Sequence, residues 1–381
     1  VDPKALPVTM EVDYVRVWQK QPLLPYKPYL QNPTKDGITI MYQTSEPCHQ
    51  WVEFGTDSTQ MTRKRALLGG QEICHDIKGK VRLEGLTPGV TYYYRVGAQA
   101  FLKNDTYSKA FGPVEYTPCY SFTLPGEKTT EFRALVLNDL HLNYHKGTWE
   151  RMSELTKDWK YDFVIFNGDC ITEPQNQQDA IWLINTLAGA FRGSTTPCFF
   201  VRGNHEIRGA FSSGMPELLD NPGGKTYGAF SWGDTRIVVL DCGEDKSDDH
   251  KEYFGLNDFT SFREEQIPFL EKELKSKAFK KAKARILVNH IPLWGNGDKY
   301  RPCTEMWNPL LKKAPFHVNI SAHTHKYRII PVGEAGNPYP VVIGGNPTNA
   351  TPIILEKKGN KLTLEAYDES GKIVDTLEWK L

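Results

Sequence analysis

Six short apolar runs in the C-terminal two thirds of the chain place the strongest constraint on its fold. They are nearly continuous rather than alternating, which is typical of strands buried on both faces of a sheet. Segments with helical periodicity separate many of them, at residues 148–159, 176–191 and 261–277. Strands that alternate with helices predict a layered α/β domain. The runs read FRALVLND, DFVIFNGD, PCFFVRGN, TRIVVLDC, RILVNH and FHVNISAH.

The segments around these runs carry their own signals. In the third helical segment Ser261 and Glu264 have the spacing of a capping box, which indicates a helix start there, while Pro268 leaves a later start as the alternative. Residues 243–258 are rich in charge and predict a solvated loop, with a substrate lid as the alternative. Residues 352–359, 361–368 and 372–379 alternate around GN and ESG turns and predict three further strands.

The N-terminal third shows β patterns throughout. The runs GITIMYQT, QWVEFGT, GKVRLEGL and TYYYRVGA are separated by turn residues, and no helical period interrupts residues 25–124. Short strands with regular turns indicate a small sandwich. The segment TLPGEKTTEF then has the composition of a linker. We therefore expect a β-sandwich at residues 22–126 and a second domain at residues 130–381, preceded by a separate β segment at residues 1–21.

Polar side chains follow five of the apolar runs directly. In an open α/β sheet the carboxyl ends of the strands form the edge where ligands bind. Five of the ten histidines in the chain occupy such positions. Imidazole and carboxylate together suit zinc, iron or manganese. The candidate site residues are Asp139, His141, Asp169, Asn204, His205, His290, His323 and His325.

Each candidate also has a structural explanation. Asp139 and His141 fit a turn after a strand, and Asn204 fits an Asx-turn. Asp169 fits a helix cap, and His290 fits a hydrogen-bonded core histidine. Their joint occurrence at the ends of five strands favours a shared metal site over five separate explanations.

Composition excludes several other classes of protein. Lys+Arg and Asp+Glu both number 46, so no net charge attracts the chain to nucleic acid or an anionic membrane. No apolar run approaches the roughly 18 residues of a membrane span. The seven cysteines are widely spaced without C-x-x-C, which excludes a disulfide framework or a zinc ribbon. The chain opens on Val1, so we expect that an upstream segment has been removed and that the protein is periplasmic or secreted. Nothing in the sequence indicates an oligomeric state.

The order of motifs between Asp139 and His325, D-x-H, G-D, G-N-H-E, H and H-x-H, resembles that of the calcineurin-like metallophosphoesterase superfamily. The resemblance covers residues 130–345. It implies a four-layer α/β/β/α domain with two divalent or mixed-valence metal ions, Mn, Fe or Zn. One ion would be held by Asp139, His141, Asp169 and His325, and the other by Asp169, Asn204, His290 and His323. Asp169 would bridge the two ions, and His205 would face the substrate.

The N-terminal region, through its strand pattern and LTPGVTYYYRV, resembles the fibronectin type III-like domain of purple acid phosphatases. Three positions depart from the expected motifs. His141 stands where those phosphatases have Gly, and Thr172 stands where they have a Tyr ligand. Without that phenolate we expect neither the purple colour nor a fixed ferric ion. In the last motif Ala322 replaces a Gly.

These resemblances imply metal-dependent hydrolysis of a small-molecule phosphate ester. A metal-bridging hydroxide would attack phosphorus, Asn204 would hold phosphoryl oxygens, and His205 would stabilise or protonate the leaving alkoxide. The phosphatase-like N-terminal region favours a phosphomonoesterase. The alternatives are a phosphodiesterase on the same core, or a non-catalytic binding protein that retains the fold. A nucleic acid partner and a membrane span are not expected.

Overall fold

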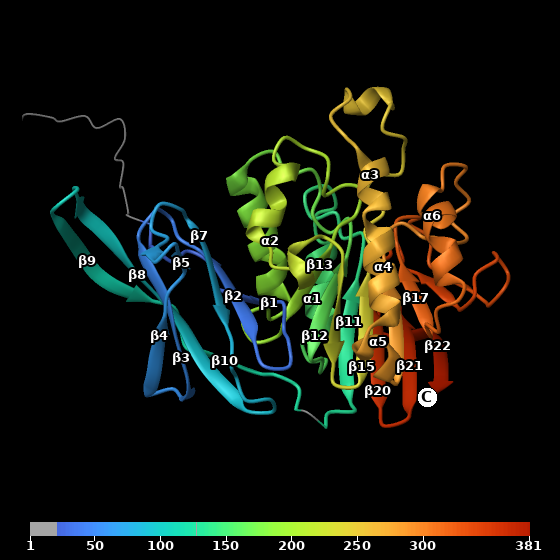
Figure 1. Ribbon diagram of the computed structural model, residues 1–381, viewed down its shortest axis with the longest axis horizontal. Helices are drawn as coiled ribbons and strands as arrows, with labels where there is room; N and C mark the ends of the chain where they lie inside the picture. The colour runs from blue at the N-terminus through green and yellow to red at the C-terminus, as the bar shows by residue number, and fades with distance from the viewer. Residues whose placement is uncertain (1–20, 127) are drawn as a thin grey trace, which may run out of the picture.

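The computed structural model describes residues 21–126 and 128–381. The β segment expected at residues 1–21 lies outside the described residues apart from Gln21. A β region occupies the N-terminal end of the described chain, and a region of mixed strands and helices follows it (Figure 1). A short connection after β10 joins the two regions.

Two sheets form most of the N-terminal region. The first has the order β1–β2–β7, and the second has the order β10–β8–β3–β4 with β9 also paired to β8. Side chains from both sheets, including Ile40, Val52 and Tyr94, form one buried cluster. The prediction of a largely β N-terminal region is confirmed. The strands are β1 (Tyr29–Gln31), β2 (Ile38–Gln43), β3 (His49–Asp57), β4 (Gln60–Lys64), β5 (Leu67–Leu68), β6 (Gln71–Glu72), β7 (Lys78–Leu83), β8 (Thr91–Asn104), β9 (Lys109–Tyr116) and β10 (Tyr120–Thr123).

The C-terminal region is built on two six-stranded sheets. The first has the order β13–β12–β11–β20–β21–β22, in which β11, β12 and β13 are parallel. The strands are β11 (Phe132–Leu137), β12 (Phe163–Asn167), β13 (Cys198–Val201), β20 (Ile353–Lys358), β21 (Lys361–Tyr367) and β22 (Ile373–Lys380).

The second sheet has the order β14–β15–β16–β17–β19–β18, in which β15, β16, β17 and β19 are parallel. The strands are β14 (Gly228–Trp232), β15 (Thr235–Val239), β16 (Ala284–Val288), β17 (Val318–Ser321), β18 (Arg328–Ile330) and β19 (Val341–Ile343). All six apolar runs identified in the sequence are strands of these two sheets, as predicted.

Apolar side chains between the two sheets form a shared core, with Val136 and Ile165 from the first sheet and Ile286 and Ile320 from the second. On its other face the first sheet packs against α1 (Thr148–Thr156) and α2 (Gln177–Ala190). The second sheet packs against α4 (Gln266–Lys275) and α6 (Pro302–Leu311). The strand ends that carry the candidate residues therefore open along one edge of this stack.

The third predicted helix begins earlier than its capping-box pattern indicates. Asp258 is the N-cap, and its side chain accepts a hydrogen bond from the backbone N–H of Ser261. Ser261 therefore lies inside α3 (Phe259–Glu264), and the predicted start is wrong. Glu265 separates α3 from α4, so that Pro268 falls in the first turn of a new helix, where proline is tolerated. The remaining α-helix of the described chain, α5, spans Lys277–Lys281, and short 3₁₀-helices span Ser212–Leu218, Pro222–Gly224 and Lys251–Tyr253.

Buried polar contacts attach the N-terminal region to α2, to the loop between α2 and β13, and to the 3₁₀-helix Ser212–Leu218. The Tyr29 hydroxyl donates to the carbonyl of Leu218 at 2.7 Å, and the Tyr94 hydroxyl donates to the carbonyl of Ser194 at 2.7 Å. The Asn185 amide donates to Gln43 Oε1 at 2.7 Å. A side chain that loses such a partner while buried destabilises the fold, so these contacts favour one orientation of the two regions.

Candidate metal centre and active site

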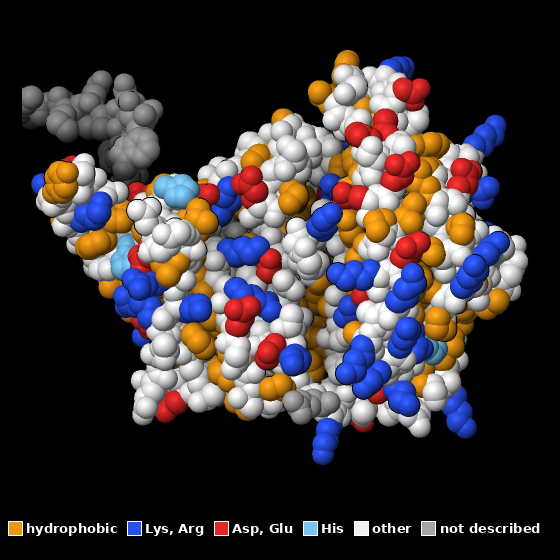
Figure 2. Space-filling model, in the orientation of Figure 1, with side chains coloured by type: hydrophobic (Ala, Val, Ile, Leu, Met, Phe, Trp, Pro, Cys, Tyr) orange, Lys and Arg blue, Asp and Glu red, His pale blue; other side chains and the backbone are white. Residues whose placement is uncertain are grey.

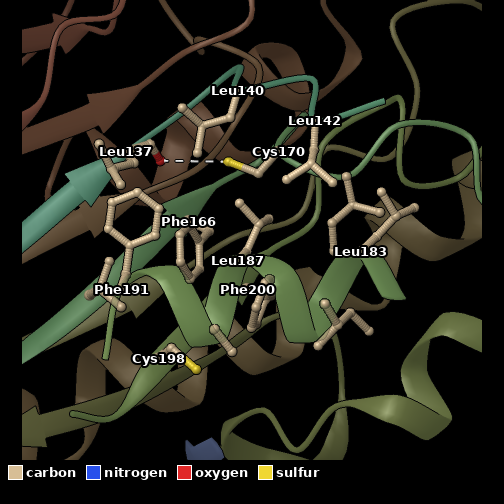
Figure 3. Close-up of a cluster of buried hydrophobic side chains, with 14 of the residues drawn as sticks. Leu137, Leu140, Leu142, Phe166, Cys170, Leu183, Leu187, Phe191, Cys198 and Phe200 are labelled. Carbon is tan, nitrogen blue, oxygen red and sulfur yellow. Dashed lines mark hydrogen bonds between the residues drawn. The ribbon is translucent and has the colours of Figure 1, made fainter. Parts of the chain in front are cut away.

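The loops that carry the candidate residues are anchored by the apolar side chains that alternate with them. After β11, Leu140 and Leu142 enter a buried apolar cluster (Figure 3). Asp139 and His141, which alternate with them, are not part of that cluster. After β12, Cys170, which follows Asp169, packs into the same cluster. Its thiol donates a weak hydrogen bond to the carbonyl of Leu137 at 3.9 Å. Cys170 is thus a core residue.

The backbone at these strand ends adopts left-handed conformations that residues other than glycine rarely take. Such a conformation costs about 1 kcal/mol or more, and it is retained where surrounding contacts impose it. The tight turns let neighbouring strands direct their polar side chains towards one point. The residues and their φ angles are Asp139 (47°), His141 (40°), Asp169 (50°), His323 (70°) and His325 (56°).

Asp139, His141 and His325 form the first group of donor atoms. Asp139 Oδ1 lies 3.2 Å from His325 Nε2 and 3.8 Å from His141 Nε2. The two Nε2 atoms lie 3.3 Å apart. The other carboxylate oxygen, Asp139 Oδ2, accepts from the backbone N–H of His323 at 3.1 Å and from the Asn138 amide at 2.7 Å. One oxygen is thus fixed by the protein while the other faces the histidines.

Asp169, His290 and His323 form the second group. His290 Nε2 lies 3.0 Å from Asp169 Oδ2, and its Nδ1 faces the backbone carbonyl of Asn167 at 2.8 Å. That carbonyl fixes the tautomer of the ring and turns Nε2 towards the site. Asn204 joins this group through its Oδ1 atom, which lies 2.9 Å from His323 Nδ1.

A single oxygen atom, Asp169 Oδ2, faces both groups. It lies 3.0 Å from His290 Nε2 in the second group and 3.9 Å from His141 Nε2 in the first. The other oxygen, Oδ1, accepts from the backbone N–H of His205 at 2.8 Å. The structure thus brings all eight candidate residues together, with Asp169 between two donor groups.

The hydrogen bonding and protonation of the donor atoms suit them to binding metal ions. Asp139 Oδ1 and His290 Nε2 are buried and make no well-aligned hydrogen bond, although they lie 3.2 Å from His325 Nε2 and 3.0 Å from Asp169 Oδ2; this arrangement is costly unless something else binds them. Burial lowers the pKa of His141 to about 4, which favours the neutral ring that binds metal. Burial alone would lower the pKa of His290 as well, but the charge of Asp169 raises it to about 10. The proton on that ring occupies the place of a cation and would leave when one binds.

His205 stands on the solvent side of the centre among charged groups. Its Nε2 atom lies 4.0 Å from Asp169 Oδ2, so the three donors of His141, Asp169 and His205 also form a possible group. Its Nδ1 atom lies 3.4 Å from Glu173 Oε1, and Arg208 Nη1 lies 3.3 Å from its Nε2. Burial lowers the pKa of His205.

Glu206 supports the centre from behind, a role that its place in the G-N-H-E motif does not by itself indicate. Its carboxylate accepts from the backbone N–H groups of Asp169 (2.9 Å), Ile171 (2.9 Å) and Gly203 (2.8 Å). Burial raises the pKa of Glu206 to about 7, and the charge of Asp169 acts in the same direction. Glu206 therefore connects the loop after β12 to the loop after β13.

The first residues of the charge-rich segment 243–258 differ from the expected solvated loop, because they make contacts beside the centre. Glu244 is buried and binds the Arg208 guanidinium twice, at 2.7 and 3.0 Å, and Asp245 adds a contact at 3.3 Å. Asp245 Oδ2 also lies 4.0 Å from His323 Nε2. Apart from the run of charge, no sequence signal indicates these contacts, which join segments remote in the chain.

The fold and these donor groups together define a metallohydrolase. The sequence model for the family described as calcineurin-like phosphoesterase matches residues 132–327, slightly more than half of the chain. The chain therefore belongs to the calcineurin-like phosphoesterases, and it is a metal-dependent phosphoester hydrolase. A search of curated protein sequences gives no match.

Two solved structures share the fold over nearly the whole chain. The purple acid phosphatase PPD1 from yellow lupin (Lupinus luteus) seeds matches with a TM-score of 0.71 and 17% identity, over 94% of this chain and 75% of that one. The structure of PhoD matches with a TM-score of 0.67 and 12% identity, over 96% of this chain and 92% of that one. Both alignments extend well beyond the family match, so the N-terminal β region and the C-terminal region occur together in these structures.

The longest described helix, α2, has 14 residues, and no helix in the described ranges combines the length and the apolarity needed to cross a bilayer.

Proposed function

We propose that the protein is a phosphomonoesterase that uses two divalent or mixed-valence metal ions, Mn, Fe or Zn. The observation that carries this proposal is the position of Asp169 Oδ2 between two donor groups, each of which also contains imidazole nitrogen atoms. One cation is assigned to Asp139, His141, Asp169 and His325. The other is assigned to Asp169, Asn204, His290 and His323.

The cations would supply an activated water molecule at neutral pH and would neutralise charge on the phosphoryl oxygens. The protein fixes the donors around them. The Asn167 carbonyl orients His290, and the His205 N–H orients Asp169. Thr172 Oγ1, 3.1 Å from His141 Nδ1, orients that ring and occupies the position where purple acid phosphatases have their Tyr. With no phenolate there, we still expect no purple colour.

Two residues are assigned to the substrate itself. The Asn204 amide, held by His323, presents N–H donors that would bind a phosphoryl oxygen. His205 stands on the solvent side, where the leaving group would depart, and would donate a proton to the leaving alkoxide. His205 is assigned to proton transfer and not to metal binding, because its Nδ1 atom is directed at Glu173.

Family membership suggests an architecture of two domains for this chain. We assign residues 22–126 to a fibronectin type III-like sandwich and residues 130–381 to a four-layer α/β/β/α domain. The two facing sheets with helices outside them support the second assignment. A periplasmic or secreted location remains a prediction.

One assay with metal analysis tests the function. The purified protein would be assayed on an aryl phosphate monoester and on the matching bis-aryl phosphate diester, with bound metals quantified. We expect two metal equivalents and a higher kcat/KM for the monoester. A higher kcat/KM for the diester would make the protein a phosphodiesterase. Two bound metals without any hydrolysis would make it a binding protein that retains the fold.

A further inference from the structure

The charges beside His205 and His323 have a consequence for the substrate. Three carboxylates lie there, and a fourth joins them through Lys246. We call these four the acidic collar: Glu173, Glu244, Asp245 and Glu252. Glu173 lies 3.4 Å from His205 Nδ1, and Asp245 lies 4.0 Å from His323 Nε2. Their side chains are 29% and 25% exposed, so both reach the open side of the centre.

The two cations among these groups are already engaged. The Arg208 guanidinium binds both oxygens of Glu244 and contacts Asp245. Lys246 lies 2.9 Å from Asp245 and 3.8 Å from Glu252. Glu173 contacts neither Arg208 nor Lys246 in this set: one oxygen lies 3.4 Å from His205 Nδ1, and the other accepts from the Tyr144 hydroxyl. Four carboxylates thus face two permanent cations, and the carboxylate nearest to His205 is paired with neither of them.

The orientation that we propose for the substrate directs its leaving group towards the acidic collar. If the phosphoryl group lies on the metal ions, the ester oxygen faces His205, and the rest of the leaving group extends past Glu173 and Asp245. An anionic leaving group would meet like charge there, whereas a cationic one would meet opposite charge at close range.

We propose that the acidic collar selects phosphate esters whose leaving group carries a cation, such as amino-alcohol phosphates, over esters whose leaving group carries a second anion. The inference rests on the proposed function, because it assumes a phosphate monoester bound with its leaving group towards His205. Within the collar, Glu173 and Asp245 are the specificity-determining residues. Glu244 instead acts through Arg208 as a positioning residue.

The test uses three small monoesters that differ mainly in charge: 2-aminoethyl phosphate (cationic), ethyl phosphate (neutral) and carboxymethyl phosphate (anionic). The intrinsic reactivity of each leaving group cancels when the ratio of kcat/KM between two esters is compared across variants. We expect Glu173→Gln and Asp245→Asn each to lower the cation-to-anion ratio by roughly fivefold, the size of one partly exposed charge pair. Glu217→Gln removes a charge remote from the site, where Glu217 pairs with Lys78, and should leave the ratio unchanged.

Salt provides a second measurement that needs no variant. In the wild-type protein, the cation-to-anion ratio should fall as ionic strength rises from about 0.05 to 1 M, because screening acts on partly exposed charges. Hydrolysis of ethyl phosphate, together with a ratio that changes neither with salt nor in the two variants, would overturn the inference and leave the phosphatase function standing. If the protein hydrolyses none of the three esters and no aryl phosphate either, the proposed function itself is overturned.

Discussion

Gly168 and His290 occupy adjoining space so closely that a Cβ atom on Gly168 would lie 2.3 Å from His290 Nδ1. Gly168 has φ of 81° and directly precedes Asp169. The absence of a side chain there lets the His290 ring approach the Asn167 carbonyl and the carboxylate of Asp169.

Gly168→Ala should therefore displace His290 and reduce metal content. The substitution combines left-handed strain, worth about 1–3 kcal/mol, with a clash against a buried ring. Gly223→Ala is a matched control, because Gly223 has φ of 80° but nothing within 4 Å of the added Cβ. Metal stoichiometry and urea unfolding of both variants check the prediction. Equal metal content in the two variants would show that the close contact between Gly168 and His290 does not affect metal binding.

Asp169→Asn should abolish activity and reduce bound metal from two ions towards one or none. The amide keeps the shape of the side chain but removes the charge that we assign to both ions. The Oδ1 contact with the His205 N–H can persist, so the fold should survive, as circular dichroism would verify. A variant with two ions and wild-type turnover would refute the bridging role.

Chelation should inactivate the protein reversibly, and added manganese, iron or zinc should restore turnover. Unfolding need not follow, because the core between the sheets and beneath the helices is apolar and independent of the ions. The measurement is activity and near-UV circular dichroism before chelation, after it and after metal addition. Full activity in verified metal-free protein would contradict the assignment.

His205→Ala should separate proton transfer from metal binding. Losing a positioned acid costs about 10²–10⁴ in rate, and an alkyl phosphate, whose alkoxide needs the proton, should lose most of it. An aryl phosphate should lose much less, and metal content should stay near the wild-type value.

His323→Ala should instead lower metal content and reduce activity on both esters together. His75→Ala serves as the control, because His75 is an exposed histidine in the N-terminal region. Depleted metal in His205→Ala, with equal losses on the two esters, would place His205 among the ligands.

Glu206→Gln should lower the free energy of unfolding by about 1–3 kcal/mol. In the wild-type protein the carboxylate accepts from three backbone N–H groups, whereas the NH₂ group of the variant would face at least one of them donor to donor. The loops after β12 and β13 would separate, so activity should fall as well. Denaturant unfolding compared with Glu217→Gln, an exposed change of the same type, gives the measurement. Indistinguishable stabilities of the two variants would argue against the supporting role.

The fold was largely predictable because its central strands are buried on both faces and leave continuous apolar runs. The short strands β14, β18 and β19 lack that signal: β18 and β19 have three residues each, and β14 alternates between buried and partly buried positions. The start of α3 was misjudged because Asp258 outcompetes Ser261 as the cap, a choice made by local geometry.

The candidate residues were predictable because each directly follows a strand. Glu173, Arg208 and Glu244 were not predictable, since their contacts with His205 and with each other join loops more than 30 residues apart. Sequence spacing places a residue on an element, but it does not show which distant loop that residue will meet. The acidic collar became apparent only from the arrangement of the folded chain.

Five donor residues at three strand ends hold the left-handed backbone, so stability of the metal-free chain and metal binding make opposite demands on these positions. Replacing the partly exposed His325 by glycine would relieve local strain in the metal-free chain, and such a change should raise thermal stability in a screen run without metal. Selection for heat resistance under those conditions would thus remove this donor residue first. Stabilised versions of this enzyme should therefore be selected with metal bound.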